Sequence, residues 1–261
     1  MKSISFIDLS MPISASIITD PPPLRPQIRY VDHKESLPGM LAFFPGLAAG
    51  DLPDGEGWAV EDLTLTAHSG THMDAPWHYH STTDHGATSA PTIDVAPLDL
   101  FWRPGVKLDF RHLPDGYVAT AGDIAKELTR IGYRLQPFDI VLVNTAAAAA
   151  YGSDHYLEAG CGLGREATNF LTDCGVQVVG TDAWSWDAPF SHTARRYAAQ
   201  GDPAIIWEGH KAGRERPYYQ MEKLMNLDKL PAHGFMLSCF PVKIERGSAG
   251  WVRAVAMVEA A

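Results

Sequence analysis

The chain has 261 residues, enough for one large domain or two small ones with a sizeable hydrophobic core. Its composition, 46% hydrophobic and 20% charged, is typical of a globular protein. The formal net charge of −10 argues against nucleic-acid binding, which usually requires a basic face.

Three cysteines, Cys161, Cys174 and Cys239, are odd in number and widely spaced. They match no zinc-ribbon pattern and favour a reducing compartment. The first residues lack a long apolar core, and no apolar run is long enough to cross a bilayer. We therefore expect a cytoplasmic protein that does not bind membranes.

The first part of the chain predicts one short strand and then a long irregular segment. Ile4, Phe6 and Leu9 indicate the strand, and residues 10–57 are rich in proline and glycine. A loop of this length usually covers a functional site or makes an interaction, so we expect an arm or lid. Its aromatic residues, including Trp58, either face a substrate or anchor the segment to the core.

A cluster of histidines follows. Alternating polarity predicts a half-buried strand that ends at His68, and four of the eleven histidines lie within residues 68–80. His72, Asp74 and His78 are an even number of residues apart, so an extended backbone, favoured by Pro76, would project them to one side. A single histidine on a strand is usually structural, but this density favours metal ligation. A mixed nitrogen and oxygen ligand set suits zinc, manganese or iron.

The next segments alternate between strands and helices. Residues 106–110, 139–144 and 176–180 predict strands, of which 139–144 is buried on both faces, and residues 120–132 and 165–174 predict helices. This order indicates an α/β fold. Trp184 and Trp186 follow a strand end, and they would share one side of an extended segment. They either bind a flat aromatic substrate or belong to the core.

The last third predicts a helix at 193–199, a short strand at 204–207, and closing strands at 235–237 and 251–258. His210 and Glu222 lie between these elements. Each is by itself a weak signal, because an isolated histidine is usually structural and an isolated glutamate is usually solvated. No repeat or linker divides the chain, so we expect one domain over residues 1–261.

The run His68-x-Gly70-Thr71-His72-x-Asp74-x-Pro76-x-His78 resembles the signature of the metal-dependent cyclase family. Seven fixed positions within eleven residues make the pattern specific. The resemblance implies a swivelling β/β/α fold and a homodimer or higher homo-oligomer. It makes His68, His72 and Asp74 metal ligands and His78 the catalytic acid/base.

The same resemblance implies further site residues. It makes His210 a catalytic and substrate-binding residue, and it makes Glu222, twelve residues later, a possible ligand of a second metal ion. The tryptophans proposed to bind substrate are Trp58, Trp77, Trp184 and Trp186. The family pattern of a pocket tryptophan soon after the first strand is absent, because no tryptophan precedes Trp58.

The resemblance implies hydrolysis of a small aromatic amide by metal-activated water. The residues 57–59, 180–189 and 208–214 are most similar to family members that open the lactam ring of isatin to isatinate with Mn²⁺, with Zn²⁺ as the second choice. Hydrolysis of N-formylkynurenine is the close alternative. Two other classes remain open, a non-haem iron oxygenase and a binding protein without catalysis.

Overall fold

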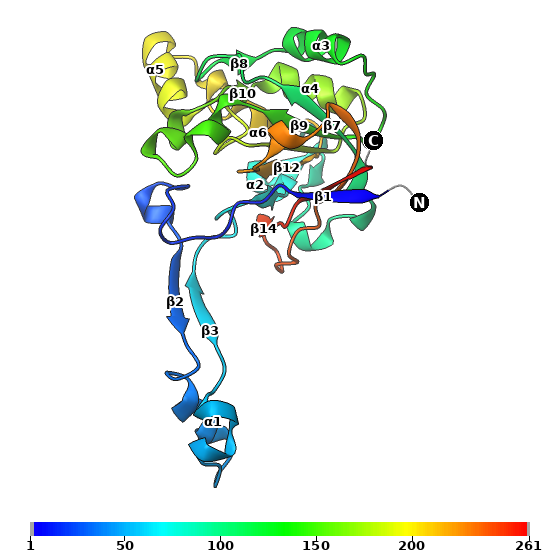
Figure 1. Cartoon of the computed structure of the whole chain (residues 1–261). Helices are drawn as coiled ribbons and strands as arrows, with labels where there is room; N and C mark the ends of the chain where they lie inside the picture. The colour runs from blue at the N-terminus through cyan, green and yellow to red at the C-terminus, as the bar shows by residue number, and fades with distance from the viewer. Residues whose placement is uncertain (1–2, 260–261) are drawn as a thin grey trace.

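The computed structural model describes residues 3–259, and a nine-stranded mixed sheet forms its centre (Figure 1). The strand order is β1-β15-β13-β7-β9-β11-β12-β4-β14. The four central strands β7, β9, β11 and β12 are parallel, and the other pairs are antiparallel. The strands of this sheet are β1 (Ile4–Asp8), β4 (His72–Asp74), β7 (Trp102–Asp109), β9 (Ile140–Asn144), β11 (Val178–Thr181), β12 (Tyr219–Glu222), β13 (His233–Ser238), β14 (Ala249–Trp251) and β15 (Val255–Glu259).

Strand β9 is buried on both faces, as its apolar sequence predicts. Ile140 and Leu142 point into one hydrophobic cluster, whereas Val141 and Val143 point into another. The first cluster also contains Ala256 of β15, the strand next to the edge strand β1. The sheet therefore curls so that β15 shares a hydrophobic cluster with the central strand β9. Because successive side chains of a strand point to opposite faces of the sheet, β9 contributes to both hydrophobic clusters.

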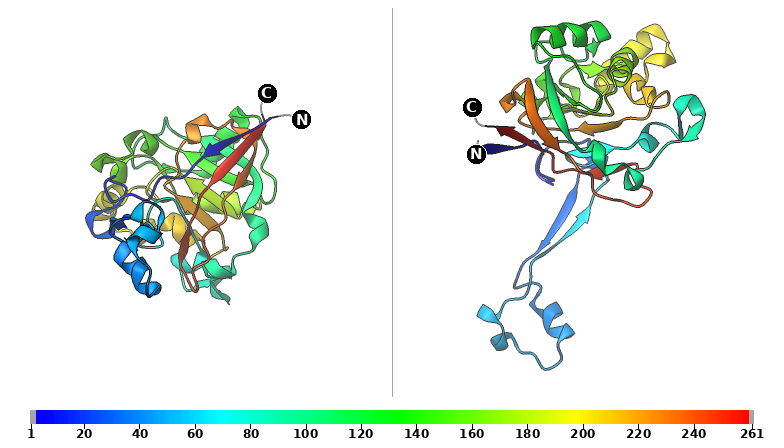
Figure 2. Two further views of the ribbon diagram at one scale, coloured as in Figure 1. Left: turned by 60° about the horizontal axis from the view of Figure 1, so that its bottom comes forward. Right: turned by 90° about the vertical axis from the view of Figure 1, so that its right-hand side faces the viewer.

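Helices cover the second face of the sheet (Figures 1 and 2). Ile124 of α3 and Leu171 of α4 pack there with the valines of β9. Thr120 caps the start of α3, and its side chain accepts a hydrogen bond from the Asp123 amide in the predicted capping box. The helices are α1 (Leu37–Phe43), α2 (Pro76–Tyr79), α3 (Ala121–Arg130), α4 (Arg165–Asp173), α5 (Phe190–Gln200) and α6 (Glu208–Ala212).

The segment expected to be an irregular arm or lid contains regular structure. Strands β2 (Gln27–Val31) and β3 (Val60–Thr64) form an antiparallel pair, and α1 lies between them in the sequence. We call residues 27–64 the ribbon, which projects from the body of the protein (Figures 1 and 2). The four other short strands of the described chain pair as β5 (Thr82–Thr83) with β6 (Thr88–Ser89) and β8 (Val118–Ala119) with β10 (Gly162–Leu163).

Three local predictions were wrong. The strand expected to end at His68 stops at Thr64, and all its residues are exposed because it belongs to the ribbon. Residues 204–207 form no strand, because Pro203 begins a 3-10 helix there. The last predicted strand is divided into β14 and β15.

The α/β class is confirmed, with parallel central strands and helices that connect them. Within residues 3–259, every helix is too short or too polar to cross a membrane.

Candidate metal centre and active-site cavity

Two neighbouring strands place most of the charged site residues on one face of the sheet. In the antiparallel pairing of β4 with β12, His72 lies opposite Glu222 and Asp74 lies opposite Gln220. Alternation puts these four side chains on the same face, while Met73 enters the core on the other face. Strand pairing therefore explains why residues about 150 positions apart meet.

His68 and His78 reach the same place from irregular segments. His68 lies in a turn just before Gly70, whose φ of +63° suits glycine. Pro76 does not keep the chain extended as predicted but occupies the first turn of α2, a position that suits proline. The prediction that an extended backbone would bring His78 to the side of Asp74 was therefore wrong. His78 lies in the helical turn α2, and this turn places its side chain near Asp74.

Asp74 is the centre of the cluster. Its Oδ1 lies 2.9 Å from His68 Nδ1 and 3.2 Å from His72 Nε2. Its Oδ2 lies 3.9 Å from His78 Nε2. Donor atoms of His68, Asp74 and His78 lie within 4.8 Å of one another, as do those of His72, Asp74 and Glu222. The structure thus gathers all three predicted ligands around one carboxylate.

Two atoms of this cluster are buried without a hydrogen-bond partner, His72 Nε2 and Asp74 Oδ1. The Nδ1–H of His72 donates to the carbonyl oxygen of Gly70 at 3.0 Å, which leaves Nε2 as a lone-pair donor. Buried polar atoms without partners are costly and therefore rare. The lone pair of His72 Nε2 and the Asp74 Oδ1 oxygen, 3.2 Å apart, are suitable ligands for a cation.

The pKa values of Asp74 and His78 are both lowered in this cluster. Burial alone would raise the pKa of Asp74, but His72 and His78 outweigh it and hold the pKa well below its usual range. Burial lowers the pKa of His78 to about 4. At neutral pH Asp74 is therefore ionised and His78 is a neutral ring that can accept a proton.

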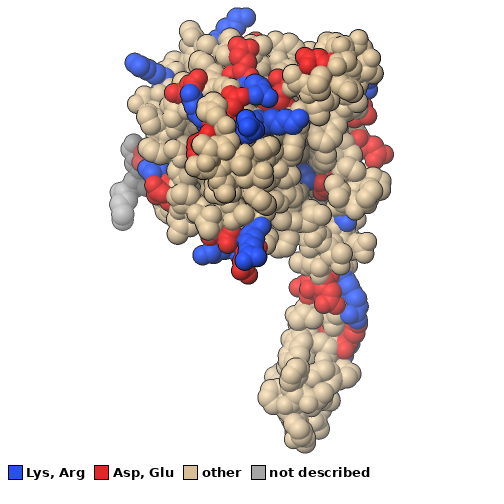
Figure 3. All heavy atoms as spheres, turned by 180° about the vertical axis from the view of Figure 1, so that it is seen from behind, with Lys and Arg blue, Asp and Glu red and all other residues tan. Residues whose placement is uncertain are grey.

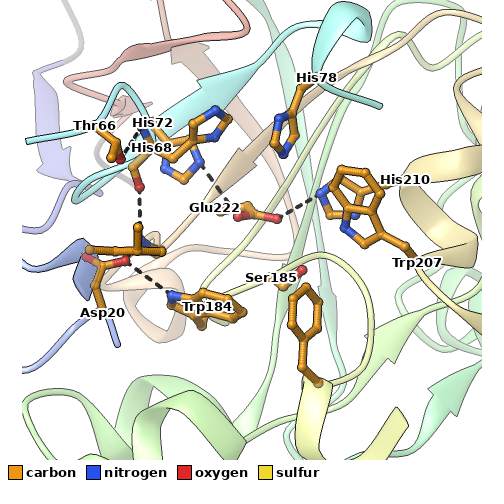
Figure 4. Close-up of a pocket in the computed structure, with 13 residues that line it drawn as sticks. Asp20, Thr66, His68, His72, His78, Trp184, Ser185, Trp207, His210 and Glu222 are labelled. Carbon is orange, nitrogen blue, oxygen red and sulfur yellow. Dashed lines mark hydrogen bonds and ion pairs between the residues drawn. The ribbon is translucent and has the colours of Figure 1, made fainter. Parts of the chain in front are cut away.

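His210 and Glu222 meet as the resemblance implied. His210 Nε2 lies 3.4 Å from Glu222 Oε1 and 3.7 Å from Asp74 Oδ2. Figure 4 shows the Glu222 carboxylate between His72 and His210. His210 Nδ1 contacts Asp187 Oδ2 at 2.5 Å, so Asp187 fixes the ring orientation.

A cavity of about 290 Å³ opens above the cluster. Its other wall is largely aromatic, formed by Trp184, Trp207 and Phe190 (Figure 4). The Trp207 ring stacks on His210 at a centroid distance of 4.4 Å and an interplanar angle of 22°. The cavity therefore combines a polar, anionic floor with a flat apolar wall.

The structure brings only one of the four predicted tryptophans, Trp184, to this cavity. Trp58 lies on the ribbon against Phe43, and Trp77 is 44% exposed at the surface. Trp186 is fully buried in the core, where its Nε1–H donates to Thr168 Oγ1 at 3.0 Å. The backbone of residues 182–188 bends repeatedly, so Trp184 and Trp186 do not share a side as they would in a strand.

Sequence reasoning missed several residues at the site. Trp207 was assigned to a strand, but it precedes α6 with a left-handed φ of +57°. Gln220 and Lys223 lie within two residues of Glu222, and this closeness in sequence was the only feature that could have indicated a place at the site. Asp20 had no signal at all: it reaches the cavity rim by forming a buried ion pair with Lys223.

The model of a family described as "Putative cyclase" matches residues 7–188, which is most of the chain and includes the whole histidine cluster. The chain belongs to this cyclase family. The predicted family and its fold are therefore confirmed.

Relatives of this chain include enzymes with two related activities. An isatin hydrolase from Roseibium aggregatum is 27% identical over 221 residues, which cover 78% of this chain and 77% of the relative. A kynurenine formamidase from Paracidovorax citrulli is 28% identical over 225 residues, 79% of this chain and 88% of the relative. The crystal structure of an isatin hydrolase bound to the product analogue thioisatinate has a TM-score of 0.75 at 21% identity, over 98% of this chain and 93% of that one.

Proposed function

We propose that this protein is a metal-dependent hydrolase that opens a small cyclic amide, with isatin as its substrate and isatinate as its product. The observation that carries this proposal is the pair of buried atoms without a hydrogen-bond partner, His72 Nε2 and Asp74 Oδ1, beside a cavity that His72 lines and that has an aromatic wall. Isatin hydrolase and kynurenine formamidase relatives support the reaction class.

His68, His72 and Asp74 would hold the ion, and the cluster contains no cysteine. Nitrogen and oxygen donors suit Mn²⁺, with Zn²⁺ as the alternative. Such an ion, when bound, acidifies water and polarises a carbonyl group.

The chain's own residues supply the proton transfers and the orientation of the substrate. His78 Nε2, 3.9 Å from Asp74 Oδ2, is a neutral base at the cavity edge and can pass a proton from water to the departing amide nitrogen. His210, fixed by Asp187, is placed to donate a hydrogen bond to a carbonyl oxygen as negative charge develops there. Trp184 and Trp207 in the cavity wall would keep water away from the aromatic ring of the substrate.

The shape of the cavity favours a flat bicyclic substrate. Its volume of about 290 Å³ lies near the lower limit of ligand pockets, and its aromatic wall suits stacking against a fused ring. The second candidate is an N-formylkynurenine formamidase, supported by the 28% identical relative that the match covers over 88% of its length. Both reactions break an aryl amide bond by attack of water.

The test offers isatin and N-formylkynurenine side by side to purified protein of measured metal content. We expect ring opening of isatin to be at least ~10-fold more efficient in kcat/KM, loss of activity after chelation, and restoration by Mn²⁺. A preference for N-formylkynurenine would select the second candidate. Turnover that consumes dioxygen would overturn the hydrolase proposal, and binding without turnover of either compound would indicate a binding protein.

We also propose that the chain forms a homodimer through the ribbon. Phe43 and Phe44 near its end are 73% and 56% exposed. In Figure 3 the far end of the ribbon is uncharged on the side turned toward the viewer, whereas charged side chains lie nearer to the body. Exposed aromatic clusters of this kind mark interaction surfaces.

Sedimentation of the purified protein is expected to give a species of twice the chain mass. The double change Phe43→Ser and Phe44→Ser should shift it toward monomer, because less apolar surface is buried on association. The matched control is Phe138→Ser, a 40% exposed phenylalanine on the body of the protein, which should leave the mass unchanged. A monomeric parent protein would contradict this proposal.

A further inference from the structure

A buried glutamine lies beside the metal centre and has no assigned role. Gln220 is fully buried, and it projects from β12 on the same face as Glu222. Its Nε2 lies 2.8 Å from Glu222 Oε1, 3.3 Å from Asp74 Oδ2 and 2.8 Å from His210 Nε2. One amide nitrogen is thus within hydrogen-bonding distance of two carboxylates and an imidazole.

The surroundings fix the orientation of this amide. Carboxylate oxygens accept hydrogen bonds, so the NH₂ group must face Asp74 and Glu222. The hydroxyl of Tyr218 lies 3.1 Å from Gln220 Oε1 and 2.9 Å from the carbonyl oxygen of Gly209. The NH₂ group has two hydrogens, which the Glu222 oxygen at 2.8 Å and the Asp74 oxygen at 3.3 Å accept.

The two halves of the cluster therefore differ. His72 Nε2 and Asp74 Oδ1 are unpartnered, as expected for atoms that await a cation. Asp74 Oδ2, Glu222 Oε1 and His210 Nε2 converge in the same way, yet each lies within reach of the Gln220 amide. These three atoms would be the ligands of a second cation.

We infer that Gln220 takes the place of a second metal ion and keeps this site mononuclear. The partly positive NH₂ group donates to two of the ligand atoms that a second cation would need, Glu222 Oε1 and Asp74 Oδ2, and it occupies the space between them and His210 Nε2. This inference rests on the proposed metal-dependent function, and it specifies how many ions that function uses.

The experiment counts ions and does not depend on activity. Protein stripped by a chelator is loaded with excess Mn²⁺, freed of unbound ion by gel filtration, and analysed by elemental mass spectrometry. We expect one Mn²⁺ per chain for the parent protein and two for Gln220→Ala. Electron paramagnetic resonance should show an exchange-coupled Mn²⁺ pair in the variant alone, because two ions that share Asp74 lie close together.

Two further variants locate the second ion and guard against misfolding. Adding Glu222→Gln to Gln220→Ala should return the count to one, because it removes a ligand charge. Gln220→Val lacks the amide but has a β-branched side chain that suits a strand, so it replaces Gln220→Ala if that variant does not fold. The matched control is Gln136→Ala at an exposed position.

The outcomes separate this inference from the proposed function. Two ions per chain in the parent protein, or one ion in a folded Gln220 variant, would overturn the role of Gln220 alone. No bound ion in the parent protein would overturn the metal-dependent function itself.

Discussion

Asp74→Asn is expected to abolish tight metal binding and to lower kcat/KM by more than about 10³-fold, which corresponds to about 4 kcal/mol of transition-state stabilisation. The reason is geometric as well as electrostatic. Asp74 Oδ1 faces both His68 and His72, and no other described carboxylate lies as close to either ring. Elemental analysis of the loaded protein and initial rates with isatin measure the two effects.

The fold should survive this change, because the amide has nearly the same shape as the carboxylate. Thermal unfolding without metal at pH 7 is expected to show a lower Tm than that of the parent protein, because the neighbouring histidines stabilise the ionised Asp74 carboxylate in the folded state. Asp99→Asn is the matched control, because the Asp99 side chain is 70% exposed and outside the cavity. A fully loaded and active Asp74→Asn protein would exclude Asp74 as a ligand.

His78→Ala is expected to lower kcat by about 10²- to 10⁴-fold while metal content stays at the parent value. His78 Nε2 lies 3.9 Å from Asp74 Oδ2, farther than the rings of His68 and His72 lie from that carboxylate. Burial lowers the pKa of His78 to about 4, so the ring is neutral at pH 7 and acts as a base. Rates and elemental analysis on the same preparation separate proton transfer from metal binding.

His80→Ala supplies the matched control. His80 is exposed two residues further along the chain, and its Nδ1 contacts Thr82 at 3.1 Å instead of the cavity. We expect its rate to stay within about 2-fold of the parent, as for most surface substitutions. If His78→Ala lost its metal together with its activity, His78 would be a ligand and not the proton carrier.

Sequence patterns that lie within one strand or helix were the most reliable predictors of side-chain position. His72 and Asp74 lie on one strand, so their spacing alone placed them on one face. The capping box at Thr120 and the apolar run 140–144 likewise depend on neighbouring residues, and both were predicted correctly. Trp184 and Trp186 have the same spacing as His72 and Asp74, but their segment bends, and one points into the cavity while the other is buried.

Other site residues depend on contacts between distant parts of the chain. Register between β4 and β12 sets Gln220 opposite Asp74, and a buried ion pair brings Asp20 to Lys223. Neither contact has a local sequence pattern, because each joins segments separated by more than a hundred residues.

Local spacing and residue type were enough to predict the family, the α/β class and the candidate metal cluster from His68 to His78. The folded chain was needed to show which tryptophan reaches the cavity, which atoms of the cluster lack hydrogen-bond partners, and that the Gln220 amide lies between Asp74, Glu222 and His210. The physical reason is that side-chain direction follows local backbone geometry, whereas the partners of a buried polar atom depend on how distant strands pair and helices pack.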